Sequence, residues 1–349
     1  MNIDNLFQVG FNHLLAPVGC REKAAVAETG LPQALADLGE AVRLEEIVLL
    51  STCSRMELYG VAVDPEQAIA AARRWFLERG GPEIEPCLVS LQGREALTHL
   101  FRVSSGLDSW IIGESEILGQ VRRAYEAARA LQRTGPVLNR VFQSAVAAGK
   151  AARAQTGIQN GIHSIGGAAA ILARSIFGET TNGMTVVFGA GEAAEAAVRH
   201  LAAKSFSRVY VANRTLEKAQ TLAGLFGGTG VDLAEGLRLL EEAEIAVFST
   251  SCPNVLGKDA LKRLAAGRRR PLFLIDVGMP RNVEPACAEV EGVYLYNLDD
   301  LKGVVARSIA GKAGPQQQAE ALVKEAVLDC VLQLNKAAAR ARTPQEAAA

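Results

Sequence analysis

A single cysteine stands where an apolar run gives way to a polar one in the stretch VLLSTCSRMELYG, Val48–Gly60. Cys53 follows the hydroxyl groups of Ser51 and Thr52 and precedes the cation of Arg55 by two residues. A neighbouring cation lowers the pKa of a thiol and makes thiolate available at neutral pH. The residues therefore predict a nucleophile at the rim of a cleft or, since free cysteine is also a common core residue, a buried thiol.

Polar residues gather in a second stretch, HLFRVSSGLDSWIIGESEILGQVRRAY. They stand among apolar positions and are His99, Ser105, Asp108, Ser109, Glu114, Glu116 and Gln120. Polar groups at this density need partners when buried, so the segment predicts a hydrogen-bonded network or a recognition site for a polar ligand. His99 fits a proton shuttle or a satisfied core histidine, and spacing alone favours the core.

An apolar strand runs straight into a glycine turn and a helix in the stretch VVFGAGEAAEAAVRHL. Gly189 would make the tight turn, Gly191 would let the backbone approach a pyrophosphate, and Ala194 would fill the small position where helix and strand pack. The phosphates would bind at the helix N-terminus, where unpaired N–H groups favour anions. This context predicts a dinucleotide-binding turn.

The following strand ends in VANRT and indicates which dinucleotide is bound. It lacks the acidic residue that would bond a ribose 2′-hydroxyl, and Arg214 stands there instead. Because an arginine can pair with a 2′-phosphate, NADPH is favoured over NADH; the alternative is a solvent-exposed arginine at a strand end. The predicted cofactor-binding residues are Gly189, Ala190, Gly191, Glu192, Ala193, Ala194, Asn213, Arg214 and Thr215.

The elements that must position these residues predict an α/β protein. Short apolar runs in LFQVGFNH and EEIVLLSTC predict strands, and PEQAIAAARRWFLERG predicts a helix, so the first segment is α+β. The pattern from about Gly113 to Ile176 is almost wholly helical. Strands and helices then alternate over Thr185–Asp300, which predicts a parallel sheet covered on both faces. A last apolar stripe at helical spacing runs from Leu322 to Leu334.

Length and composition exclude several classes of protein. The 349 residues exceed one typical core, so two domains are expected. Six cysteines without a C-x-x-C pair give no support to a zinc site or a disulfide framework, and no metal is expected. No apolar run reaches the roughly 18 residues that span a bilayer, and the first residues lack an export signal. We therefore expect a soluble cytoplasmic protein that binds no membrane.

The net charge of -1 hides a local excess of basic residues. Between Leu118 and Gln155 the acidic residue Glu126 stands alone, and the basic residues are Arg122, Arg123, Arg129, Arg133, Arg140, Lys150 and Arg153. A basic helical face can hold a phosphate backbone by neutralising its charge. A solvated helix face explains the same charges equally well.

Motifs along the chain resemble, in order, those of the glutamyl-tRNA reductase family. The resemblance covers about Gly10 to Leu301. The motifs are FNHLLAPVGCREKAA, LLSTCSRMELYG, SSGLDSWIIGESEILGQVRRAY, VFGAGEAAEAAVRHLA, VANRTLEKAQTLA, DVGMPRNVEP and YLYNLDDL.

This resemblance implies NADPH-dependent reduction of glutamyl-tRNA(Glu) to glutamate-1-semialdehyde, the first step of the five-carbon route to 5-aminolevulinate and tetrapyrroles. It implies that the Cys53 thiolate attacks the ester carbonyl and forms a thioester, which hydride reduces. His99 matches the family's acid–base histidine, which reverses the preference for a core residue. The implied substrate-binding residues are Thr52, Ser54, Arg55, Ser109, Glu114, Ser115, Glu116 and Gln120.

The resemblance also implies how substrate and partners are held. A carboxylate would bind the substrate's ammonium group, and the Arg55 guanidinium would bind its carboxylate. Glutamate-1-semialdehyde aminotransferase is the implied partner for the product. Two other hypotheses stay open: a regulatory paralogue that binds glutamyl-tRNA, haem or a protein without turnover, and a shikimate-dehydrogenase-like enzyme acting on a small free substrate.

The chain departs from the family pattern at Ser54, Met56, Ser115 and Glu116. In place of glutamine, Glu116 adds a negative charge beside the expected substrate site. This charge is expected to alter affinity or pH dependence.

The C-terminal part departs further from the family pattern. Family members usually continue through a long helix into a dimerisation domain, whereas Gly314 and Pro315 are expected to interrupt the helix here, and the tail is expected to fray. The chain is therefore expected to be a short form, either monomeric or paired through the Leu322–Leu334 stripe. The expected divisions are an N-terminal catalytic and substrate domain (1–150), a helical connector (151–176), a Rossmann-type NADP-binding domain (177–301) and a C-terminal helical remnant of the dimerisation region (302–349).

Overall fold

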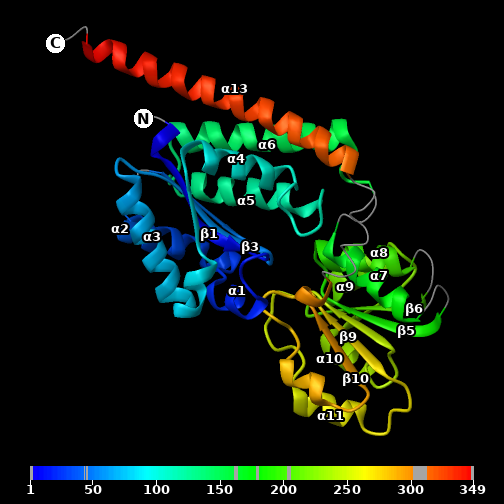
Figure 1. Ribbon diagram of the computed structural model, residues 1–349. Helices are drawn as coiled ribbons and strands as arrows, with labels where there is room; N and C mark the ends of the chain where they lie inside the picture. The colour runs from blue at the N-terminus through cyan, green and yellow to red at the C-terminus, as the bar shows by residue number, and fades with distance from the viewer. Residues whose placement is uncertain are drawn as a thin grey trace. The chain divides into compact units, whose positions relative to one another are not determined.

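The chain folds as two units, seen in the computed structural model of Figure 1. One unit comprises Met1–Gly161 together with Ile309–Ala349, and the other comprises Ile162–Ser308. The structure describes residues 3–42, 44, 46–160, 164–177, 181–202, 206–301 and 313–346. No helix within these ranges has both the length and the apolar character needed to cross a membrane.

The first unit is built on a four-stranded sheet in the order β2-β3-β1-β4, with every neighbouring pair antiparallel. Its strands are β1 (Leu6–Asn12), β2 (Glu46–Ser51), β3 (Arg55–Val61) and β4 (Val89–Gln92). β2 and β3 form a hairpin whose last pair is Ser51 with Met56. Because nearly all residues of both strands are buried, the turn that contains Cys53 is held by a rigid base.

Helices pack around this sheet, and one of them shows how the sequence sets their ends. α3 begins at Pro65, where Asp64 before it accepts a hydrogen bond from the Gln67 N–H. It ends at Gly80 and is capped by Gly81, whose φ is 85°. These are the N-cap, first-turn proline and C-terminal glycine signals expected of a helix. The helices and 3-10 turns before the C-terminal helix are α1 (Val18–Ala24), α2 (Leu31–Val42), α3 (Pro65–Gly80), α4 (Gly93–Ser104), α5 (Glu116–Ala130), α6 (Pro136–Thr156), η1 (Ile3–Asn5), η2 (Glu28–Gly30) and η3 (Pro82–Cys87).

A long C-terminal helix, α13 (Ala313–Glu346), belongs to the first unit and lies along α6 (Figure 1). The buried residues that join it to the core of this unit are Ala319, Val323, Val327, Cys330 and Leu334. These residues are therefore covered inside their own unit, which disagrees with the alternative in which two chains pair through the stripe. The oligomeric state of the chain stays a prediction.

The start and end of α13 also differ from expectation. Gly314 and Pro315 do not interrupt a helix; they lie in the first turn of α13, where the missing N–H of proline needs no partner. The tail expected to fray is helical as far as Glu346. The remainder of the predicted C-terminal region, 302–312 and 347–349, lies outside the described residues.

The second unit carries a six-stranded sheet in the order β10-β9-β8-β5-β6-β7, and all its pairs are parallel. Counted from β5, this is the 3-2-1-4-5-6 order of the doubly wound dinucleotide-binding fold, so the predicted parallel sheet is confirmed. The strands are β5 (Thr181–Phe188), β6 (Phe206–Asn213), β7 (Thr229–Asp232), β8 (Ile245–Phe248), β9 (Leu272–Asp276) and β10 (Val293–Asn297). The helices and 3-10 turns are α7 (Ile165–Phe177), α8 (Glu192–Ala202), α9 (Leu216–Gly224), α10 (Leu233–Leu239), α11 (Lys258–Ala265), η4 (Pro285–Glu289) and η5 (Leu298–Leu301).

The helical connector expected at 151–176 is divided between the two units. Its first boundary falls inside α6, which belongs to the first unit, and its second boundary falls inside α7, which belongs to the second. α6 ends at Thr156 and is capped by Gly157, which adopts a left-handed conformation with a φ of 66°. Residues 161–163, which follow, lie outside the described part of the chain.

Candidate active site

The Cys53 turn is held by the side chain of the residue before it. The Thr52 N–H donates to the Arg55 carbonyl at 2.9 Å, which closes the turn. The Thr52 hydroxyl oxygen accepts from the N–H groups of Ser54 at 3.2 Å and Arg55 at 3.1 Å. The half-buried Cys53 Sγ lies 3.7 Å from the Ser54 hydroxyl oxygen. Thr52 and Ser54, predicted to bind substrate, thus also shape the turn that presents the thiol.

Arg21 fixes the same turn from α1. It is 4% exposed, and its Nε donates to the Ala16 carbonyl at 3.1 Å while Nη1 donates to the Cys53 carbonyl. Arg21 was not among the predicted site residues, although it lies in the motif GCREKAA. A buried arginine in a helix, aimed at a turn distant in sequence, is visible only in the folded chain.

The surroundings of the Cys53 thiol disfavour its ionisation by raising its pKa. Burial raises its pKa to about 12, and the carboxylate of Glu114 adds to the rise. The Ser54 hydroxyl and the Arg21 cation oppose it, while Glu116 raises the pKa further. The prediction that Arg55 lowers the pKa of Cys53 is wrong, because the cation that acts on this thiol is Arg21. Glu116, expected to add a negative charge beside the substrate site, thus lies near enough to act on this thiol.

The Arg55 guanidinium forms ion pairs with two carboxylates, those of Glu57 and Asp108. Its side chain has 0% exposure, and its Nη1 lies 2.7 Å from Glu57 Oε1 and 3.1 Å from Asp108 Oδ2. Its Nη2 donates to the Asp108 carbonyl. In the structure this enclosed guanidinium joins β3 to the segment after α4. Its binding of the substrate carboxylate stays a prediction.

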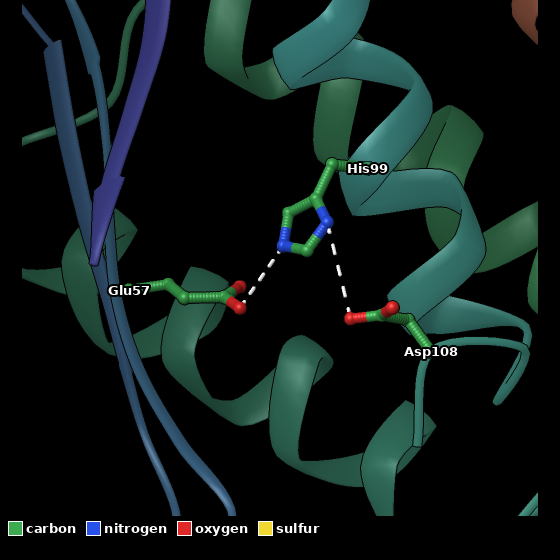
Figure 2. A group of neighbouring side chains, drawn as sticks. All are labelled: Glu57, His99 and Asp108. Atoms are coloured by element: carbon green, nitrogen blue, oxygen red, sulfur yellow. Dashed lines mark hydrogen bonds and ion pairs between the residues drawn. The ribbon is translucent and has the colours of Figure 1, made fainter. Parts of the chain in front are cut away.

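His99 of α4 lies between Glu57 and Asp108, as Figure 2 shows. Its Nε2 is 3.0 Å from Glu57 Oε1, and its Nδ1 is 3.9 Å from Asp108 Oδ2. Its ring stacks on Tyr59, with centroids 6.5 Å apart, and the Tyr59 hydroxyl donates to Glu57 Oε2 at 2.7 Å. His99 is therefore bonded at one nitrogen, and its side chain keeps 17% exposure.

Glu57 was missed by the sequence analysis, although one signal was available: it is an acidic residue inside the strand sequence RMELYGV, where its neighbours are apolar. Burial alone would raise its pKa, but Arg55 and His99 lower the pKa of Glu57 to about 2. Glu57, His99 and Asp108 could together ligate a cation. The Arg55 guanidinium already supplies positive charge to both carboxylates, so the cluster does not fit a metal ion.

The other predicted substrate residues lie after Asp108 and at the start of α5. Ser109 and Glu114 are buried, and burial raises the pKa of Glu114 to about 7, against the opposing charge of Arg55. Ser115 is exposed at the N-cap of α5, and Glu116 is the first residue of that helix. This helix start brings two carboxylates close enough to act on the Cys53 thiol.

Gln120 lines a cavity of about 440 Å³ between α2, α5 and β2. Ser51, two residues before Cys53, lies on the same cavity wall, together with Arg123 and the apolar side chains of Leu50 and Leu131. The structure thus brings Gln120 beside the strand that leads into the Cys53 turn.

The basic helical face is smaller than the sequence suggested. Arg153 turns inward, where Nη1 donates to the Ser104 carbonyl and Nη2 to the Glu114 carbonyl, both at 2.8 Å. Arg122 pairs with Glu126 on the surface at 3.6 Å. Arg153 therefore belongs to the scaffold of the site and not to a solvent-facing basic patch.

The glycine turn of the second unit has the geometry that a dinucleotide needs. Gly189 has a φ of 116°, and a Cβ there would lie 2.4 Å from the Ser249 carbonyl oxygen, so the position requires glycine. A Cβ at Gly191 would meet no atom within 4 Å, which leaves room for a phosphate to approach the backbone. Ala194 is fully buried where α8 packs on the sheet. The described residues therefore fit a bound dinucleotide.

The other predicted cofactor residues follow β6 or line the turn itself. Asn213 Nδ2 donates to the Thr215 carbonyl at 3.1 Å, and the exposed Arg214 has Nη1 3.9 Å from Cys252 Sγ. Ala190 lines a cavity of about 330 Å³ together with Glu195 and Lys218. Glu192 and Ala193 open α8.

The motif DVGMPRNVEP holds the segment that follows β8, a role that was not predicted from the sequence. Asp276 Oδ2 accepts from the Asn282 N–H at 2.8 Å. The Asn282 side chain in turn accepts from the Thr250 N–H at 2.7 Å and donates to the Cys252 carbonyl at 2.8 Å. This network fixes the segment after β8, whose Ser249 carbonyl contacts Gly189.

The two units define a class of protein: an oxidoreductase that joins a dinucleotide-binding unit to an α+β unit with a cysteine and a histidine. Residues 9–156 match the family model described as glutamyl-tRNAGlu reductase, N-terminal domain, and residues 171–304 match that of shikimate / quinate 5-dehydrogenase. The chain belongs to the glutamyl-tRNA reductase family.

Individual relatives support this membership. The glutamyl-tRNA reductase of Thermus thermophilus is 44% identical over 326 residues, which cover 93% of this chain and 79% of the relative. That of Trichlorobacter lovleyi is 37% identical over 329 residues, covering 93% and 76%. The solved glutamyl-tRNA reductase from Methanopyrus kandleri matches with a TM-score of 0.53 and 33% identity, covering 95% of this chain and 81% of that one.

Proposed function

We propose that this chain reduces glutamyl-tRNA(Glu) to glutamate-1-semialdehyde with NADPH, through a thioester on Cys53. The observation that carries the proposal is the half-buried thiol in a rigid turn of the unit that matches the reductase family. The same chain carries a glycine turn with open space at Gly191. A regulatory paralogue that binds without turnover would need neither the Cys53 thiol nor the glycine turn.

Cys53 would act twice in this reaction. Its thiolate attacks the ester carbonyl of the charged tRNA, a sulfur–carbon bond forms, and the tRNA ribose oxygen leaves with a proton. When bound, NADPH supplies the hydride that reduces the thioester carbonyl. Cys53 then leaves as thiolate while the aldehyde forms. A covalent thioester keeps the carbonyl in place after the large tRNA leaving group has departed.

The substrate itself would help to ionise the thiol. The pKa of about 12 keeps Cys53 protonated at neutral pH, and Glu114 and Glu116 contribute to that value. A substrate ammonium group bound beside these carboxylates would cancel part of their negative field. Thiolate would then form mainly when charged tRNA is bound, which protects the thiol from other electrophiles.

The preference for NADPH rests on the end of β6. The exposed Arg214 follows this strand, where an acidic residue would otherwise select a ribose 2′-hydroxyl. We also propose that the product passes to glutamate-1-semialdehyde aminotransferase, because an aldehyde beside an amino group is reactive in water and gains from prompt consumption.

A single-turnover experiment tests the function. NADPH oxidation is followed with glutamyl-tRNA(Glu), and the product is analysed for semialdehyde. We expect Cys53→Ser to reduce the rate on the order of 10³-fold or more while tRNA binding persists, and Cys20→Ser to react normally. If the unaltered protein binds glutamyl-tRNA(Glu) but oxidises no NADPH, the result would contradict the proposed function and support the regulatory paralogue.

A further inference from the structure

Glu57 is surrounded by hydrogen-bond donors. Oε1 faces Arg55 Nη1 at 2.7 Å, and Oε2 accepts from the Tyr59 hydroxyl at 2.7 Å. A guanidinium has no acceptor atom, so Glu57 must accept from it, and a carboxylate with two such neighbours is held as the anion. Glu57 is 1% exposed, so water does not compete for these oxygens.

The anion dictates where His99 carries its proton. Nε2 lies 3.0 Å from Glu57 Oε1, a hydrogen-bond distance at which one of the two atoms must be a donor. Because the carboxylate can only accept, Nε2 must bear the hydrogen. The stacked ring of Tyr59 restrains the imidazole plane in the same orientation.

The other nitrogen is then the one that can exchange protons. Nδ1 is 3.9 Å from Asp108 Oδ2, which is too long for a hydrogen bond. Asp108 itself bonds to Arg55 at 3.1 Å and lies 3.5 Å from Asn12 Nδ2. In neutral His99 with its hydrogen on Nε2, Nδ1 holds a lone pair. Figure 2 shows this nitrogen on the side of Asp108, away from the Glu57 contact.

We propose that Glu57 is a positioning residue that holds His99 in the Nε2–H form, so that Nδ1 carries the proton transfer of thioester formation. This inference rests on the proposed function. In this step a water molecule carries the proton of the Cys53 thiol to Nδ1, and Nδ1 gives it to the ribose oxygen. The sulfur–carbon bond forms, the carbon–oxygen bond breaks, and no net proton is consumed. Asp108, near Nδ1, stabilises the imidazolium between the two transfers.

Among the residues that the structure describes, four charged or titratable groups face His99. Glu57, Arg55 and Tyr59 face it from β3, and Asp108 faces it from the segment after α4. On the side of α4 that packs against α13, Glu320 is paired with Arg102. Glu57 is therefore the carboxylate in hydrogen-bond contact with the ring among the residues that the structure describes.

The first test uses the unaltered chain and needs no substrate. The protein is labelled with 15N-histidine, and the ring nitrogens of His99 are assigned by comparison with His99→Gln. We expect a protonated, pyrrole-type Nε2 and a pyridine-type Nδ1 when the ring is neutral. A neutral ring with its proton on Nδ1 would overturn the proposal. This readout is independent of catalysis, so it separates a failure of the inference from a failure of the proposed function.

The second test compares Glu57→Gln with Tyr59→Phe. A glutamine amide can donate as well as accept, so Glu57→Gln is expected to give a mixture of the two His99 tautomers and to lower kcat by at least about 10-fold with little change in KM. Tyr59→Phe keeps the Glu57 charge and its contact with His99, so it is expected to retain the Nε2–H form and activity within about 3-fold. Full activity and an unchanged tautomer in a folded Glu57→Gln variant would contradict the proposal.

Discussion

The two turns that carry the chemistry of this protein use different parts of the chain. In the second unit, the turn at Gly189 works through its backbone: a φ of 116° and open space beside Gly191 prepare N–H groups for a phosphate. In the first unit, the turn at Cys53 depends on side chains from α1, β3 and the start of α5. Backbone sites are therefore local in sequence, whereas the thiol site is assembled from distant segments.

This difference predicts how each turn fails. We expect Gly189→Ala to be the most damaging change, because its Cβ would meet the Ser249 carbonyl oxygen at 2.4 Å in a strained conformation. The free energy of unfolding of the full chain should fall by about 3 kcal/mol or more. Gly191→Ala is the matched control: its Cβ meets no protein atom, so stability should stay within about 0.5 kcal/mol while NADPH binding weakens. Urea denaturation and NADPH titration measure both, and equal losses of stability would refute the distinction.

In the first unit the largest expected effect is on the pH dependence of stability. The folded-state pKa of Glu114 is raised from 4.5 to about 7, so the protonated carboxyl is favoured by folding. Its contribution to stability is present below pH 4.5 and is lost as the pH rises through 7, up to about 3 kcal/mol. Glu114→Gln imitates the protonated form and should be more stable than the unaltered chain at pH 8 but not at pH 4.5. Urea denaturation at both pH values measures this, and equal stability at pH 8 would argue against a buried, titrating Glu114.

The same variant sharpens the account of the nucleophile. Without the Glu114 charge, the pKa of the Cys53 thiol should fall, because one cause of its rise is removed. The rate of alkylation of Cys53 by iodoacetamide, measured against pH, should therefore reach its midpoint at a lower pH in Glu114→Gln. The remaining cysteines serve as the internal reference, since their alkylation should not shift.

A smaller effect is expected at the cofactor turn. Arg214→Ser removes the exposed cation after β6, and the KM for NADPH should rise about 10-fold, the size of one charge-assisted contact. The KM for NADH should stay unchanged, because NADH has no 2′-phosphate. An equal rise for both nucleotides would show that Arg214 shapes the turn instead of reading the phosphate.

An effect of similar size is expected in the scaffold of the first unit. Glu46 is buried at the N-terminus of α6, where its oxygens accept from the N–H groups of Val137 at 3.1 Å and Leu138 at 2.6 Å. Glu46→Gln should lower the free energy of unfolding by about 1–2 kcal/mol, because an amide NH₂ then faces a helix N–H. At the exposed N-cap of α3, Asp64→Asn should lower the free energy of unfolding by only about 0.3 kcal/mol. Thermal denaturation of both variants checks the contrast, and equal losses would contradict the role of burial.

Local patterns in the sequence predicted much of the fold correctly. The helix predicted from PEQAIAAARRWFLERG is α3, because its proline start and glycine end act within a few residues. The parallel sheet of the second unit follows from alternating apolar strands and helices. The C-terminal stripe was predicted correctly as one apolar face of a helix, but the surface that covers it is α6 and α4 of the same unit, which spacing along α13 does not reveal.

The sequence by itself determined the glycine turn, the position of the thiol after β2 and the membership of the family, since each depends on residue types at short separations. Only the tertiary structure decided the electrostatics of the thiol. In the folded chain Arg55 pairs with Glu57 and Asp108. Arg21 is the arginine that donates to the Cys53 carbonyl. The physical reason is that the energy of a buried charge depends on which groups surround it, and those groups come from segments that the sequence keeps far apart.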